Sequence, residues 1–117
     1  MYGNKNLLVG AVILSMTHDD DAITFVTDKG TCTAHTYGDC CSSTWIESVE
    51  LPARGFPATV QEVLNVDLPS PASDRDREEM QYYGLRIVTD NGDIDIDYRN
   101  SSNGYYGGSL DFPASFS

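Results

Sequence analysis

The sequence contains little positive charge. Its 117 residues include 7 Lys and Arg against 18 Asp and Glu, which gives a formal net charge of −11. Proteins that bind nucleic-acid backbones or anionic membranes depend on clustered Lys and Arg. We therefore expect neither nucleic acid nor a membrane as a direct partner. The excess acid favours solubility, and it could steer the protein towards a basic partner.

Long hydrophobic runs are also missing. The apolar segment 7–16 contains Gly10 and Ser15 and is too short to span a membrane. Only Lys5 precedes it and no small-residue cleavage pattern follows it, so we expect no signal peptide. The 3 cysteines, an odd number, favour a reducing compartment over a disulfide framework. Together these features predict a cytoplasmic protein.

Recognisable catalytic motifs are absent from the sequence. It has no phosphate-binding glycine loop, no paired acid–base signature and no Gly-x-Ser-x-Gly. A cysteine nucleophile with His35 as its base would need an orienting third group, for which only Asp39 is available. We expect a protein that is not an enzyme and that carries no cofactor.

Short alternations of apolar and polar residues, separated by turn residues, fill most of the chain. They predict strands over 8–17, 22–27, 31–37, 45–51, 81–89, 93–98 and 105–112. The segment 58–68 fits a strand or a helix equally well by its pattern. Asp28-Lys29-Gly30 and Asp90-Asn91-Gly92 predict hairpin turns, the second of type I′.

These elements predict a mainly β fold, with α+β as the alternative. We expect a single twisted antiparallel sheet or partial barrel of about six to seven strands, with at most one or two short helices near 42–50 or 74–81. The length fits a single domain over 1–117, with an ordered core of about 7–112 and a mobile loop of about 69–79. We find no repeat of fixed period and no domain linker.

The segment 93–98, Asp-Ile-Asp-Ile-Asp-Tyr, is the most regular alternation. Side chains two residues apart in a strand point to the same face, so Asp93, Asp95 and Asp97 form an anionic row while the residues between them face the core. The row is either a solvated face that deters aggregation or a surface that binds a basic partner. With Asp111 added, these aspartates are the candidate acidic binding residues.

Tyrosine and arginine gather towards the C-terminal end of the same segment. The candidate aromatic and arginine cluster consists of Tyr83, Arg86, Tyr98, Arg99, Asn103, Tyr105 and Tyr106. Tyrosine offers a large amphipathic contact area, which suits an interface or a small-ligand pocket, although ordinary sheet packing uses it too.

Cysteine and histidine occur close together near residue 35. Cys32, His35, Cys40 and Cys41 form a nominal set of four zinc ligands. Their spacing lacks a Cys-x2–4-Cys knuckle, and adjacent cysteines in an extended chain point apart. We therefore expect no metal site and a buried Cys32.

Two further segments carry a family resemblance. Gly38–Glu47, which reads Gly-Asp-Cys-Cys-x-x-x-Trp-Ile-Glu, and Ser102–Tyr106, Ser-Asn-Gly-Tyr-Tyr, resemble a family of small acidic bacteriophage and prophage proteins with a domain of unknown function. The resemblance implies a phage-encoded protein in the cytoplasm of a bacterial host, and a strand over 58–68. Pro52–Phe56 stands where other members have a short acidic helix.

We accordingly expect a non-enzymatic phage accessory protein that binds and inhibits or redirects a host protein with a basic surface. A small-molecule binder is the first alternative, for instance a sponge for a host signalling nucleotide held by Arg86 and Arg99. A minor virion protein is the second alternative, and a homodimer is left open.

Overall fold

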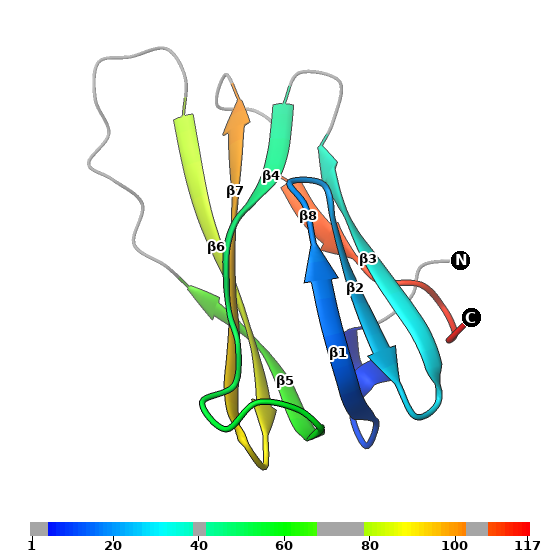
Figure 1. Ribbon diagram of the computed structural model, residues 1–117. Helices are drawn as coiled ribbons and strands as arrows, with labels where there is room; N and C mark the ends of the chain where they lie inside the picture. The colour runs from blue at the N-terminus through cyan, green and yellow to red at the C-terminus, as the bar shows by residue number, and fades with distance from the viewer. Residues whose placement is uncertain (1–4, 39–41, 68–78, 103–107) are drawn as a thin grey trace.

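The computed structural model describes residues 5–38, 42–67, 79–102 and 108–117. A 3-10 turn, η1 (Lys5–Leu8), precedes eight described strands: β1 (Val12–His18), β2 (Ala22–Thr27), β3 (Gly30–Gly38), β4 (Ser42–Glu50), β5 (Ala58–Asp67), β6 (Glu79–Thr89), β7 (Gly92–Ser102) and β8 (Gly108–Asp111). They form one open antiparallel sheet in the order β4-β7-β6-β5-β1-β2-β3-β8 (Figure 1). The predicted mainly β, single-sheet fold is confirmed.

Several details of the prediction are wrong. The strand count is eight instead of six to seven, because both 58–67 and 108–111 are strands. The helix expected near 42–50 is β4, which pairs along its length with β7. Of the helix expected over 74–81, residues 79–81 begin β6 and 74–78 lie outside the described residues, as does most of the loop predicted over 69–79. The first strand starts at Val12 because Gly10, with φ of +86°, ends the 3-10 segment.

Two turns of the sheet have the same sequence pattern and the same contacts. Val26–Gly30 and Val88–Gly92 both read Val-Thr-Asp-x-Gly. In each turn the threonine hydroxyl donates to the glycine carbonyl. The aspartate backbone and Oδ1 meanwhile hydrogen-bond the neighbouring strand, at Val12 in the first turn and at Thr59 in the second. The two copies of the pattern are short and lie far apart in the sequence, so they do not stand out as a repeat of fixed period.

These matching contacts reveal an internal two-fold repeat. The units β1-β2-β3 and β5-β6-β7 are equivalent, and they meet where Val12 pairs with Thr59 and Ile13 with Ala58. β1 and β5 even carry a bulge at equivalent positions. β4 follows β3 in the chain but pairs with β7, and β8 follows β7 but pairs with β3. The strand that follows each unit in the chain, its fourth strand, therefore pairs with the other unit.

The hydrophobic core lies between the two units. Its fully buried side chains come from both, and they include Ile13, Ile23, Phe25, Val60, Ile87, Ile94 and Ile96. The rings of Phe25 and Phe112 stack at 6.3 Å between centroids, which joins β2 to the segment after β8. The Ile46 amide donates to the Asp20 carbonyl at 2.8 Å, so the edge strand β4 closes against the β1–β2 turn. Within the described residues, no helix has the length and apolar character needed to cross a membrane.

Candidate functional site

The alternation of β7 places its aspartates on the outer side of the sheet, as predicted. Ile94 and Ile96 are buried, whereas Asp93, Asp95 and Asp97 lie on the opposite side of the strand. Neighbouring strands add further outward carboxylates at Glu62 on β5 and at Glu47 and Glu50 on β4. We call this outer side of β4, β5, β6 and β7 the acidic face. Its members are Glu47, Glu50, Glu62, Asp93, Asp95 and Asp97, with Arg86, Arg99, Trp45 and Tyr82 among them.

Arg86 lies among the aspartates of the acidic face. It sits opposite Asp95 in the β6–β7 register, and its Nε donates to Asp95 Oδ1 at 2.8 Å. Asp93 Oδ2 lies 3.8 Å from the same nitrogen. The hydrogen bond and the charge of Asp95 raise the pKa of Arg86, so the guanidinium stays charged. The aspartate row is thus partly neutralised by a side chain that the sequence analysis assigned to another cluster.

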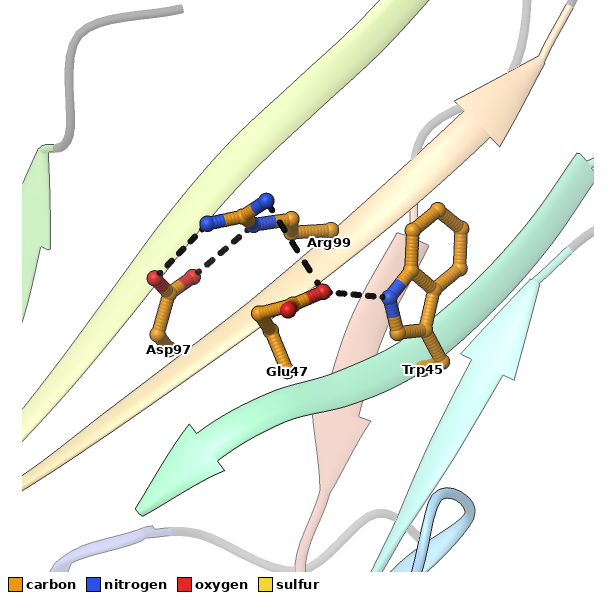
Figure 2. Close-up of polar contacts among 4 residues, drawn as sticks. All are labelled: Trp45, Glu47, Asp97 and Arg99. Carbon is orange, nitrogen blue, oxygen red and sulfur yellow. Dashed lines mark hydrogen bonds and ion pairs between the residues drawn. The ribbon is translucent and has the colours of Figure 1, made fainter. Parts of the chain in front are cut away.

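Arg99 organises the second group of polar contacts on this face. Its guanidinium contacts Asp97 Oδ2 at 3.3 Å and Glu47 Oε1 at 3.7 Å, and it lies over the Tyr82 ring at 4.2 Å from the centroid. The Trp45 indole donates to the same Glu47 oxygen at 3.0 Å (Figure 2). With Tyr82, two aromatic residues therefore join the network. The hydrogen bond to Asp97 raises the pKa of Arg99. An ordered, partly aromatic and partly charged surface results.

A shallow groove of about 240 Å³ crosses the acidic face at Gly84. It is lined by Ser48, Glu50, Val66, Gly84, Leu85, Arg86, Asp95, Ile96 and Asp97. Gly84 lies between Val66 and Asp97 in the sheet register and contributes no side chain, which leaves the hollow. Pockets for small molecules usually hold about 300 Å³ or more, so the groove suits a single side chain of a partner better.

The predicted aromatic and arginine cluster is divided by the sheet. Tyr83 and Tyr98 stack at 5.1 Å between ring centroids on the inner side, and burial raises the pKa of Tyr98. Arg86 and Arg99 project from the other side and contact carboxylates. A phosphate group would have to displace those carboxylates from both arginines. Asn103, Tyr105 and Tyr106 lie outside the described residues.

Asp111 lies apart from the other predicted acidic residues. It is on β8 opposite His35, and its Oδ1 accepts a hydrogen bond from the Ser109 hydroxyl at 2.8 Å. Its charge also helps to raise the pKa of Tyr98, after burial and Tyr83. It therefore belongs to the first unit's edge and not to the acidic face.

The nominal zinc ligands are separated by the alternation of β3. Cys32 is buried in the core, as expected, and burial raises the pKa of its thiol to about 11. His35 is exposed on the other side of the strand. No group of three or more metal-binding side chains occurs within the described parts of the chain, and Cys40 and Cys41 lie outside them.

The candidate residues predicted from the sequence did not include Trp45, Glu47, Glu50, Glu62, Tyr82 and Gly84. The alternation of 81–89 already placed Tyr82 and Gly84 on the face opposite Leu85, so a signal for these two residues was present. Trp45 and Glu47 stood out only as part of the family motif, because only the β4–β7 register brings Trp45 opposite Arg99.

The family model of a domain of unknown function, DUF7448, matches residues 6–112. No curated protein and no solved structure matches the chain. The matched domain is one of unknown function, in agreement with the resemblance drawn from the sequence, whereas an association with phages stays a prediction.

Proposed function

The chain belongs to the DUF7448 family, a domain of unknown function, and from that premise we propose that it is a non-enzymatic binding module. Its acidic face docks on a basic surface of another protein. Six carboxylates against two guanidinium groups leave this face negative among the described residues. Trp45 and Tyr82 supply the aromatic contact area that commonly anchors interfaces.

One observation carries this proposal: the equivalent positions of the first unit carry uncharged residues. The two units are equivalent, yet Thr24, Thr31 and Thr33 occupy in the first unit the positions that Arg86, Asp93 and Asp95 occupy in the second. Thr24 and Thr33 hydroxyls lie 3.3 Å apart where Arg86 and Asp95 form their ion pair. Aspartate is disfavoured in strands. Because a threonine pair occupies the equivalent position in the first unit, the sheet geometry alone does not account for the charged pair. The charge therefore supports a role in binding.

The charge also suggests how a complex would form. Long-range attraction between a face of one sign and a basic partner accelerates encounter, and buried aromatic contacts then slow dissociation. The resemblance to a phage family supports a partner of the bacterial host. We take the site of action to be the cytoplasm of an infected cell, and inhibition or redirection of the host protein to be the outcome.

The test is capture of a partner from a bacterial host lysate, followed by titration calorimetry with the purified partner. The double variant Asp95→Asn/Asp97→Asn should weaken Kd about tenfold or more, because one close ion pair across an interface contributes about 1.5 kcal/mol or more. Raised salt should lower the association rate for the native protein.

The matched control is Asp20→Asn/Asp21→Asn, which removes the same charge from the exposed β1–β2 turn. It should leave Kd within about twofold, because these residues lie outside the acidic face. If both double variants weaken Kd equally, the effect comes from the net charge of the protein and not from the acidic face. No weakening by Asp95→Asn/Asp97→Asn would refute the proposed face.

A further inference from the structure

The centre of the sheet contains an incomplete strand pair. β1 and β5 pair only at Val12↔Thr59 and Ile13↔Ala58, with flanking hydrogen bonds that end at Val60. Figure 1 shows β5 turning away from β1 beyond this point. From Glu62 to Asp67, β5 is paired with β6 on one side, and within the described chain no strand pairs with its other side. A strand edge of this kind presents unpaired backbone N–H and C=O groups.

The other free edges among the described strands are shorter or better protected. β1 is also unpaired on its β5 side beyond Ile13, but only Ser15–His18 follow its bulge. β8 has 4 residues, and β4 is bulged between Ile46 and Ser48 while its Ile46 amide is bound to Asp20. Proteins commonly protect exposed edges with Lys, Pro, bulges or short strands. After its bulge at Val60/Glu62, β5 continues through Val63–Asp67 without Lys, Arg or Pro. Among the described strands it is therefore the longest regular edge open to an additional strand.

The side chains along this edge define what would fit beside it. Glu62, Leu64 and Val66 alternate on the outer side of β5, and Leu64 is 38% exposed although it is apolar. Val66 also lines the groove at Gly84. Directly opposed side chains on neighbouring strands interact in pairs. A neighbouring strand would thus carry a basic residue opposite Glu62 and apolar residues opposite Leu64 and Val66.

We propose that the β5 edge over Glu62–Val66 binds an extended segment of another protein by strand addition. The segment alternates outward apolar, apolar and basic side chains and lies antiparallel to β5. Backbone hydrogen bonds supply the affinity, and the alternate side chains supply the specificity. The inference rests on the proposed function only in assigning this segment to the basic partner.

Charge decides between a partner segment and a second copy of the chain. Each copy carries a formal net charge of −11, and an antiparallel pair of β5 edges would bring acidic strands together. Like charges across strands are destabilising. A basic segment instead gains attraction from the same field.

The test uses the synthetic peptide acetyl-Thr-Val-Thr-Val-Thr-Lys-Thr-amide and amide hydrogen exchange followed by NMR. At saturating peptide, exchange of edge-facing amides within Glu62–Val66 should slow about tenfold or more, because strand pairing protects them. A control peptide that is N-methylated at the alternate amides facing β5 should give no protection, because those amides can no longer donate hydrogen bonds to the β5 edge. Protection that instead arises only on β7 or β4 would overturn the proposal.

Leu64→Lys tests the edge by mutation, because lysine beside a strand edge deters pairing. It should weaken peptide binding about tenfold. Val26→Lys is the matched control, since Val26 is 39% exposed on a strand that is paired on both sides, and it should bind as the native protein does. Equal binding by both variants contradicts the proposal, as does a native dimer with protected β5 amides in the absence of peptide.

The two proposals can fail separately. Asp95→Asn/Asp97→Asn should leave peptide-induced protection at β5 in place even where it weakens capture of the partner. If the protection is present and partner binding is unaffected by the double variant, the edge is established and the acidic face is refuted. If peptide-induced protection at β5 is absent and the double variant weakens partner binding, the proposed β5 edge is refuted and the proposed acidic face is supported.

Discussion

At the scale of single residues, one aspartate in the hairpin turn of each unit holds that turn against a central strand of the sheet, β1 or β5. Asp90 Oδ1 accepts a hydrogen bond from the Thr59 amide at 2.8 Å, and Asp28 Oδ1 accepts one from Val12 at 2.9 Å. Both residues also donate their own backbone N–H to the same partner residue. Aspartate is favoured in turns, and here each turn carboxylate also closes a ring of hydrogen bonds with the neighbouring strand.

Asp90→Ala should therefore lower the free energy of unfolding by about 1 kcal/mol, and Asp28→Ala by a similar amount, because each loses one hydrogen bond to a backbone amide. Asp90→Asn keeps an acceptor oxygen and should lose less. Urea denaturation measures all three, with Asp20→Ala on the exposed β1–β2 turn as the control. A loss at Asp20→Ala as large as at Asp90→Ala would show that charge, and not the hydrogen bond, matters.

At the scale of elements, the β6–β7 turn differs from the predicted type I′. That type needs positive φ at both central residues, yet within the described residues only glycines have positive φ. Asp90 and Asn91 therefore keep negative φ, and Gly92 after them adopts φ of +117°. The turn depends on this glycine and not on the Asn-Gly signal from which type I′ was inferred.

Gly92→Ala should consequently destabilise the protein by about 3 kcal/mol, because a Cβ there would lie 2.9 Å from the Ala53 amide nitrogen in a backbone conformation that side chains rarely adopt. Gly55→Ala is the comparison. Its φ is +78°, but the added Cβ meets nothing within 4 Å, so about 1 kcal/mol is expected from backbone strain alone. Equal losses in thermal or urea unfolding would rule out the contact with Ala53 as the cause.

At the scale of the whole molecule, the exchange of fourth strands binds the two units together. β4 completes the second unit and β8 completes the first, and the core takes side chains from both. Neither unit can keep its edge strand if the other unfolds. The internal repeat is thus a property of the architecture, and the exchanged strands make the stability of each unit depend on the other.

Unfolding should consequently occur in a single cooperative transition. Trp45, the 1 tryptophan of the chain, reports on β4, while far-UV circular dichroism reports on all strands. The two urea curves should coincide, which is the usual test for two-state behaviour. Fluorescence that changes before the dichroism would mean that β4 leaves the second unit independently.

Features that depend on local periodicity could be predicted from the sequence alone. Alternation placed Ile94 and Ile96 inside and the β7 aspartates outside, and it also predicted the buried Cys32. The first hairpin turn was recognisable because Gly30 supplies its positive φ. These features follow from a period of two residues and from turn chemistry, both of which are local.

Which distant residues meet depends on the three-dimensional fold and could not be predicted from the sequence. Sequence proximity grouped Tyr98 with Arg99, but adjacent residues of a strand face opposite sides, so one joined the core and the other the acidic face. The pairing of Trp45 and Glu47 with β7 required β4 to cross to the other unit. Strand register between distant segments is set by burial of the whole core, which no local pattern contains.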